Sequence, residues 1–389
     1  MANMMDYLLW RGDLLFEQAE FNEVDNLIFS ELIYVDFAGI VPGLNEEESV
    51  LLRDASDAFF KKHTDEEIEA KVSSTKAAAF LMREMAKTKR FGDVKLSHYV
   101  DHVDFREQSQ FCAATAELDD GSLFVVYSGT DNTIVGWREN FNMSFLTETP
   151  GQLKAVEYLN RVVSPRQKQI RAGGHSKGGN LAVYAAVYCR DSIQKKIVAV
   201  YSNDGPGFTD SMVSGQEYLK MLPKIHTFVP EDSIVGMLLE RKEPYRVVKS
   251  SRSGPVQHDA MTWEVLGGSF IYLEGVAQSS ILLDKTLKAW IAKLDDAQKE
   301  EFVDTLFAIL EEGDIYTIDD LVNMNGKKFI ELFKLGSIFE HENEEILKKT
   351  LKVLFEESNR TIKENVIKRE NEISKKSIKK PKIGKNMKK

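Results

Sequence analysis

The sequence predicts an α/β protein in which a mostly parallel sheet is flanked by helices and followed by a C-terminal helical module. Two observations lead to this class. Between residues 110 and 249, short apolar segments typical of strands alternate with segments whose apolar residues have helical spacing. After about residue 275 the strand pattern ends and only helical spacing remains. The first pattern is typical of a parallel sheet with helices packed on both faces.

Composition limits the possible classes of protein. The chain has 389 residues and a formal net charge of −10, with 43% hydrophobic and 29% charged residues. This length allows one large domain and a smaller module. An acidic body disfavours nucleic acid as a partner. No apolar run reaches the roughly 18 residues of a membrane span, and the first 15 residues lack the pattern of a signal peptide.

The two cysteines are predicted to be core residues. Cys112 lies in an apolar strand-like segment, and Cys189 lies at the end of an apolar helix. A single distant pair is no disulfide framework, so both are best explained as small buried side chains. Free thiols favour a reducing, cytoplasmic location.

The first part of the chain predicts helices. Residues 1–45 are expected to form an N-terminal cap segment of mixed apolar and acidic character. Helical spacing of apolar residues then predicts helices over residues 46–60 and 74–89, the second of them capped by Ser74.

The middle of the chain predicts the sheet. Strands are expected at residues 110–117, 122–127, 170–174, 196–202, 225–229 and 245–249, and helices at residues 178–189, 210–221 and 234–239. Asp119-Asp120-Gly121 between the first two strands is a hairpin turn signal, so an antiparallel pair should begin the sheet.

The last part of the chain predicts further helices and a basic tail. Helical spacing recurs at residues 282–294, 296–311, 318–333 and 343–355. We therefore predict an α/β domain with its cap over residues 1–275, a helical module over 276–367 and a disordered tail over 368–389. From Lys363 to Lys389 there are eleven lysines and arginines against three glutamates. Such a tail is either simply solvated or binds an anionic membrane surface or nucleic acid. It lacks the interleaved aromatic residues of a nucleic-acid binder and the amphipathic face of a membrane helix.

The pentapeptide Gly174-His175-Ser176-Lys177-Gly178 matches the G-x-S-x-G pattern of a nucleophile elbow. It follows a predicted strand and begins a helix rich in small residues, and this context makes the match specific. The two glycines remove side chains that would collide at a sharp turn. The helix N-terminus favours an anion formed over the serine. We predict Ser176 as a nucleophile; the alternative is a surface serine in a glycine-rich turn.

A serine nucleophile needs a histidine base, and three histidines follow Ser176 in the chain. His226 lies within a predicted strand and is expected to be a packed strand residue. His341 lies between two glutamates at a solvated helix start. His258 lies in a loop after the last predicted strand, which is where the base belongs. We therefore predict His258 as the base.

The acid that orients the histidine should follow a later parallel strand. Asp232 follows the strand at residues 225–229 and is our prediction. The alternative is Asp204, one strand earlier, which otherwise shapes a turn at the rim of the site. Glu231 and Asp259 are expected to be surface charges.

Two donors should stabilise the oxyanion. One is the backbone N–H of Lys177, and the other is expected from Thr130, in the turn after the strand at residues 122–127. Trp137, Phe141 and Phe145 follow this turn and either line an acyl pocket or lid, or belong to the core.

These motifs resemble the class 3 lipase branch of the α/β hydrolases and, more closely, the Mbeg1-like family of bacterial proteins with a lipase-like core. The resemblance covers roughly residues 5–275. Its motifs are Trp10-Arg11-Gly12-Asp13, Phe21-Asn22-Glu23-Val24-Asp25-Asn26, the elbow, Asp204-Gly205-Pro206-Gly207, Glu231-Asp232-Ser233-Ile234-Val235-Gly236 and Gln257-His258-Asp259. It implies an α/β-hydrolase fold with Ser176, Asp232 and His258 as a triad. Lys177 stands where lipases usually have an apolar residue, which argues against a long-chain lipid substrate.

The sequence therefore predicts a cytoplasmic serine esterase, lipase-like, that cleaves the carboxylic ester of a small molecule or lipid without a metal or cofactor. Its tail allows a position at the membrane periphery. The alternative is a non-catalytic binding or scaffold protein, because a hydrolase fold does not by itself fix function.

Overall fold

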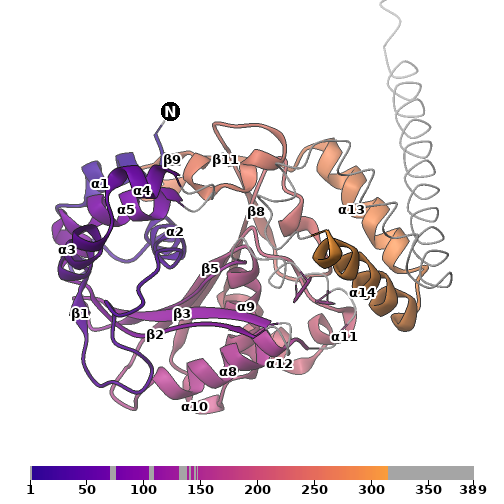
Figure 1. Ribbon diagram of the computed structural model, residues 1–389, viewed down its shortest axis with the longest axis horizontal. Helices are drawn as coiled ribbons and strands as arrows, with labels where there is room; N and C mark the ends of the chain where they lie inside the picture. Colours follow the sequence, from indigo (N-terminus) through magenta and orange to yellow (C-terminus); the bar gives the residue numbers. More distant parts are fainter. Residues whose placement is uncertain are drawn as a thin grey trace, which may run out of the picture.

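The computed structural model describes residues 2–70, 76–104, 109–130, 138–139, 142–143, 146 and 148–313. A nine-stranded sheet organises this part of the chain, in the spatial order β1-β2-β3-β4-β5-β6-β7-β8-β11 (Figure 1). Its strands are β1 (Val50–Leu51), β2 (Lys95–Asp104), β3 (Ser109–Glu117), β4 (Leu123–Tyr127), β5 (Ile170–His175), β6 (Ile197–Asn203), β7 (Ile225–Pro230), β8 (Tyr245–Val248) and β11 (Tyr272–Leu273). A two-stranded ribbon forms from β9 (Val265–Leu266) and β10 (Ser269–Phe270).

The sheet is mixed, and its parallel part lies at the centre. Strands β4 to β8 run parallel, and antiparallel strands extend them at both edges. The predicted hairpin forms between β3 and β4, with Gly121 at a φ of +74° in its turn. Strand β2 was not predicted, because a bulge between Ser97 and Val100 interrupts its alternation of side chains. The predicted α/β class, a sheet with a parallel centre flanked by helices, is confirmed.

Helices that connect the parallel strands cover one face of the sheet (Figure 1). They are α8 (Pro150–Val162), α9 (Lys177–Tyr188), α10 (Asp191–Gln194), α11 (Asp210–Val213) and α12 (Gln216–Met221). Because the parallel strands follow one another in chain order and crossovers are right-handed, these connections share a face. Their apolar side chains pack against strand residues such as Ala113, Val125 and Ala172.

The N-terminal helices cover the opposite face. They are α1 (Met4–Arg11), α2 (Glu23–Leu32), α3 (Leu52–Lys62), α4 (Asp65–Ala70), α5 (Ala77–Ala86) and α6 (Lys89–Gly92). Their core includes Ala114, Phe124 and Val126, which alternate along the strands with the residues of the first face. Helix α2 is buried from Val24 to Leu32. The segment expected as a cap is thus the layer that completes the core.

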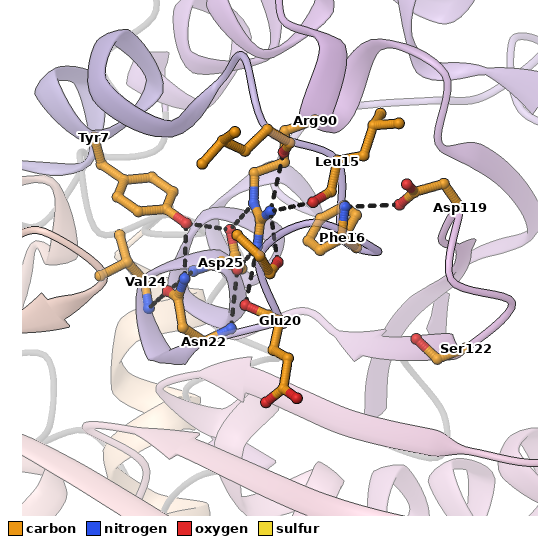
Figure 2. Close-up of polar contacts among 12 residues, drawn as sticks. Tyr7, Leu15, Phe16, Glu20, Asn22, Val24, Asp25, Arg90, Asp119 and Ser122 are labelled. Atoms are coloured by element: carbon orange, nitrogen blue, oxygen red, sulfur yellow. Dashed lines mark hydrogen bonds and ion pairs between the residues drawn. The ribbon is translucent and has the colours of Figure 1, made fainter.

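A buried ion pair joins these N-terminal helices (Figure 2). The side chains of Arg90 in α6 and Asp25 in α2 are fully buried, with 2.6 Å between Nη2 and Oδ2. The guanidinium also donates hydrogen bonds to four backbone carbonyls of the loop after α1, those of Leu14, Leu15, Ala19 and Glu20. The buried charge is therefore both paired and hydrogen-bonded, as burial requires.

Several predicted helices have different bounds. The helix expected at residues 46–60 begins only at α3, after β1, and the one at 74–89 is α5 followed by α6; Ser74 lies outside the described residues. The helix at 210–221 is two helices, α11 and α12, interrupted at Ser214-Gly215. At 234–239 there is only the 3₁₀ turn η3 (Val235–Met237). Gly236 at its centre disfavours a longer helix.

Two helices follow the sheet, α13 (Gln278–Ile291) and α14 (Asp296–Glu312), close to their predicted places. Helix α13 contacts the segment between β7 and β8, since the N–H of Ala277 bonds the carbonyl of Glu231 at 2.7 Å and Lys288 pairs with Glu240 at 3.0 Å. The helices predicted at 318–333 and 343–355, and the basic tail, lie outside the described residues. Within the described ranges, no helix is both long enough and apolar enough to cross a membrane.

Candidate active site

Ser176 lies at a sharp turn between β5 and α9. The strand ends at His175 and the helix begins at Lys177, so the predicted strand–turn–helix forms. Ser176 has φ +56° and ψ −129°, a conformation that costs a residue with a side chain of order 1 to 3 kcal/mol. Its N–H bonds the carbonyl of Asn203 at 2.9 Å, which fixes the turn to the end of β6. Such strain concentrates at functional sites.

The two glycines of the motif are required by close packing. A Cβ at Gly174 would collide with the backbone of Gly178 and with the carbonyl oxygen of Tyr127. A Cβ at Gly178 would collide with the same carbonyl oxygen. The end of β4 therefore lies directly against the turn, as the predicted oxyanion arrangement needs.

His258 and Asp204 form a hydrogen-bonded pair beside this turn. The Nδ1 atom of His258 lies 2.7 Å from Oδ2 of Asp204. His258 comes from the 3₁₀ turn η4 (Gly254–His258), and its side chain is 34% exposed, whereas that of Asp204 is fully buried. Because a carboxylate only accepts, Nδ1 of the imidazole carries the proton in this pair. Nε2 of a neutral His258 is then free to accept a proton.

The Asp204 carboxylate is held in place by two further donors. Its Oδ1 accepts from the Ser233 hydroxyl at 2.5 Å and from the Gly236 N–H at 3.1 Å. The backbone of Asp204 has φ +50° and follows directly on β6, the strand that pairs with β5. A Cβ added to Gly236 would collide with Oδ1 of Asp204. Ser233 and Gly236, both in the Glu231–Gly236 motif, therefore hold the Asp204 carboxylate in place.

The prediction that Asp232 orients His258 is wrong in this geometry. Oδ2 of Asp232 accepts from the Gly254 N–H at 2.7 Å and from Nε2 of Gln257 at 3.0 Å. Oε1 of Gln257 in turn accepts from the Asp232 N–H at 2.9 Å. Asp232 thus fastens the loop that carries His258. Asp204, the alternative, is the partner of the imidazole because β6 adjoins β5 and β7 lies one strand further away.

The other candidate histidines and carboxylates lie in different surroundings. His226 is a residue of β7 stacked on Tyr201, as expected. Glu231 is exposed, whereas Asp259 is half-buried and accepts from the Met261 N–H at the start of η5 (Ala260–Thr262). Burial raises the pKa of Asp259, so its assignment as a surface charge is wrong. The residues outside the described ranges are His341, Trp137, Phe141 and Phe145.

The predicted oxyanion loop adjoins the elbow. Thr130 is half-buried and follows Gly129, which leaves no room for a side chain beside the His175 carbonyl and the hydroxyl of Tyr34. A Cβ at Gly129 would collide with both of these groups. Lys177 is the first residue of α9, so its N–H has no acceptor within the helix.

The side chain of Lys177 is fully buried and contacts Glu139 and Gln110. Its Nζ lies 3.0 Å from Oε2 of Glu139 and donates to the carbonyl and side-chain oxygens of Gln110 at 2.7 and 2.6 Å. Oε1 of Glu139 accepts from the Gly151 N–H at the start of α8. Lys177 is therefore part of an ion pair in the core. Contrary to the expectation from the sequence, its charge does not argue against a long-chain lipid substrate.

His175, next to Ser176, is buried and neutral. Burial, with the neighbouring His258, lowers the pKa of His175 to about 3. Its Nε2 lies 2.8 Å from the carbonyl oxygen of His258, and its Nδ1 lies 3.0 Å from the Tyr34 hydroxyl. The two imidazole rings have centroids 4.6 Å apart. The elbow and the loop of His258 are thus joined through this side chain.

Helix α2 supplies polar groups beneath the elbow, which the sequence analysis missed. Asn26 and Ser30 bond the side chain of Asn203, and the Asn203 amide bonds the carbonyl of Gly174. Glu31 Oε1 lies 3.6 Å from Nδ1 of His175. Burial, with nearby Asp259, raises the pKa of Glu31 to about 8. The available signal was Asn26, Ser30 and Glu31 at positions i, i+4 and i+5 of a helix whose other residues after Asn26 are apolar.

Two solved structures of lipases are similar to this chain at low identity. In the search of solved structures, a fungal lipase studied in an inhibitor complex is 16% identical, with 41% of this chain and 68% of that chain covered and a TM-score of 0.32. M37 lipase is 14% identical, with 54% and 67% covered and a TM-score of 0.33. No curated protein matches. The Mbeg1-like family model matches residues 85–308, more than half of the chain. The chain therefore belongs to the Mbeg1-like family.

Proposed function

We propose that this protein is a serine hydrolase that cleaves a carboxylic ester, with Ser176, His258 and Asp204 as its triad. The observation that carries the proposal is the 2.7 Å contact between His258 Nδ1 and Asp204 Oδ2, which lies beside a serine in a strained turn. A neutral imidazole fixed in this tautomer is the base that a serine hydroxyl needs.

In the proposed reaction, Ser176 Oγ attacks the ester carbonyl while His258 Nε2 takes the hydroxyl proton. The resulting imidazolium is stabilised by the Asp204 carboxylate, which stays ionised. When the tetrahedral intermediate collapses, the bond to the leaving alkoxide breaks and His258 returns the proton to it. Water then attacks the acyl-serine by the same steps in reverse order, which releases the acid and restores the Ser176 hydroxyl.

The oxyanion needs donors aimed at the place where charge develops. We assign this role to the backbone N–H of Lys177, at the N-terminus of α9, and to Thr130, which follows the turn packed against the elbow. Both donors belong to segments fixed by buried contacts, so little reorganisation is needed during the reaction. No step of this mechanism calls on a metal or a cofactor.

A series of p-nitrophenyl esters of increasing acyl length tests the proposal and maps the substrate. Ser176→Ala and His258→Ala should each abolish turnover above the background rate, whereas His226→Ala, a half-buried histidine outside the site, should retain it. Turnover that survives Ser176→Ala would contradict the proposal. If the folded protein hydrolyses none of the esters and Ser176 is unreactive, the non-catalytic scaffold alternative is supported.

The basic tail at residues 368–389 carries a second, separate proposal about location. We propose that it binds anionic membrane surfaces, because ten lysines and arginines lie between Lys368 and Lys389. Binding to vesicles containing phosphatidylserine should be lost in about 0.5 M salt, which shortens the screening length, and after truncation at Lys368. Vesicle binding that persists after the truncation would contradict a role for the tail.

A further inference from the structure

We propose that Tyr34 and His175 are positioning residues that hold the oxyanion loop and the loop of His258 against the elbow. The inference rests on the proposed function, because it assigns these two residues a role in that reaction. Its basis is a chain of hydrogen bonds that joins three segments far apart in the sequence. The chain runs from Gly129 through Tyr34 and His175 to the backbone of His258.

The direction of each hydrogen bond follows from the groups that form it. The His258 carbonyl can only accept, so His175 Nε2 must carry the proton that spans their 2.8 Å contact. Since the pKa of His175 is lowered to about 3, the ring is neutral and its Nδ1 is an acceptor. The Tyr34 hydroxyl therefore donates to Nδ1 at 3.0 Å.

With its proton directed at His175, the Tyr34 oxygen is free to accept from the oxyanion loop. The Gly129 N–H bonds this oxygen, and this bond lowers the pKa of Tyr34 against the larger rise caused by burial. A Cβ at Gly129 would collide with the hydroxyl, so the loop lies directly on Tyr34. Thr130, the proposed oxyanion donor, is the next residue in the chain.

His258 is consequently held at two points. Asp204 binds its imidazole at Nδ1, and His175 binds its backbone carbonyl. The first contact fixes the tautomer and the second fixes where the backbone of the loop lies relative to Ser176. Displacement of a reacting group by about 1 Å can reduce a rate by about 100-fold, so the second contact matters for turnover.

Helix α2 and its C-terminal extension thus belong to the active site. Tyr34 lies two residues beyond α2, and Glu31 within α2 lies 3.6 Å from His175 Nδ1. This is a layer of the fold that carries no proposed catalytic residue. Its polar side chains nevertheless reach the ends of the strands that carry Ser176 and Asp204.

Three substitutions separate positioning from a merely structural role. His175→Gln retains an N–H donor at the place of Nε2, whereas His175→Phe keeps a ring and loses the donor. We expect His175→Phe to lower kcat roughly 100-fold with little change in KM, and His175→Gln to restore most of that loss. Tyr34→Phe should lower kcat roughly tenfold. His226→Gln is the matched control and should retain the kcat of the unsubstituted protein.

A spectroscopic measurement tests the inference without relying on turnover. In protein labelled with ¹⁵N-histidine, His175 should be the neutral Nε2–H tautomer throughout pH 5 to 8. The Nδ1–H signal of His258 should be retained in His175→Gln and broadened or lost in His175→Phe. If Ser176 proved unreactive, the proposed function would fail while these spectra still tested the positioning contacts.

The opposite results would overturn the inference. They are a His175 protonated on Nδ1, an equal loss of kcat in the Gln and Phe variants, or a Tyr34→Phe variant with unchanged kcat. The tautomer measurement needs no substitution, so it decides the question even if His175→Phe fails to fold.

Discussion

The imidazole of His258 bonds the carboxylate of Asp204 at 2.7 Å. The Asp232 carboxylate instead accepts hydrogen bonds from Gly254 and Gln257, in the loop that carries His258. The two carboxylates therefore have different tasks. Asp204 is fully buried and receives three hydrogen bonds at its two oxygens, so it is oriented as well as paired. Asp232 holds the loop that brings His258 to the site.

Asp204→Asn should abolish most activity, and Asp232→Asn should not. An asparagine at 204 leaves the geometry nearly intact but no longer stabilises the imidazolium or its tautomer, so we expect kcat to fall by about 10³- to 10⁴-fold. Asp232→Asn should lower kcat less than about tenfold, because Asn can still accept from the Gly254 N–H. Steady-state kinetics on the best p-nitrophenyl ester measures both, and a larger loss for the variant at 232 would refute the assignment of Asp204.

Gly236→Ala should damage the site without replacing a catalytic residue. The added Cβ would collide with Oδ1 of Asp204, so the carboxylate must move away from His258. A loss of kcat of about 10- to 100-fold is expected. Gly275→Ala is the matched control, since a Cβ there would have no atom within 4 Å. Equal kcat values for the two variants would contradict the proposed role of Gly236.

The buried pair of Lys177 and Glu139 should contribute to stability and little to catalysis. Both side chains are fully buried, so Lys177→Met leaves a buried carboxylate without its cation, which typically destabilises a protein by about 3 to 5 kcal/mol. The double variant Lys177→Met/Glu139→Gln removes that charge and should recover part of the loss. Urea unfolding measures this difference.

Because the N–H of residue 177 is unchanged, the folded Lys177→Met variant should retain kcat within about tenfold. If the double variant is as unstable as Lys177→Met, an unpaired buried charge is not the cause of the lost stability. A large loss of kcat in a fully folded single variant would instead assign the lysine charge itself to the reaction.

Glu31 should make the folded state less stable as pH rises. Burial raises its pKa from 4.5 to about 8, so the folded state keeps a proton that the unfolded state releases. Its contribution to stability is complete below pH 4.5 and is lost as pH rises through about 8. Relative to the unsubstituted protein, Glu31→Gln should therefore gain stability with a slope of at most about 1.4 kcal/mol per pH unit over this range.

Urea unfolding of both proteins at intervals from pH 5 to 9 measures this slope. His175, whose lowered pKa makes stability fall as pH decreases below 6.5, is present in both proteins, so the difference between them isolates Glu31. A difference that is independent of pH would show that Glu31 is ionised in the folded state and would contradict the raised pKa.

The sequence was most informative where the chemistry depends on neighbouring residues. The turn at Ser176 is specified by glycines two residues before and after it, and both are required by collisions seen in the structure. The hairpin before the parallel strands is likewise a local pattern. Strand β2 was missed because its bulge disturbs the alternation on which strand prediction depends.

Groups contributed by distant segments were harder to predict. Asp204 and Asp232 both follow parallel strands, and only the pairing of β6 with β5 decides which carboxylate lies beside the elbow. The contact of Tyr34 with His175 joins residues 141 positions apart in the chain. No local pattern marks such a contact, because it arises from how helix α2 packs on the second face of the sheet.

The central claim is that Ser176 is activated by the His258–Asp204 pair, and its reaction with a fluorophosphonate tests this most directly. Intact mass followed by peptide mapping should show one adduct per chain, on Ser176, formed by the folded protein and absent from heat-denatured protein. Ser176→Ala should form no adduct, and Asp204→Asn should react far more slowly than Asp232→Asn. A folded protein that leaves Ser176 unmodified, or an adduct that persists in Ser176→Ala, would contradict the account.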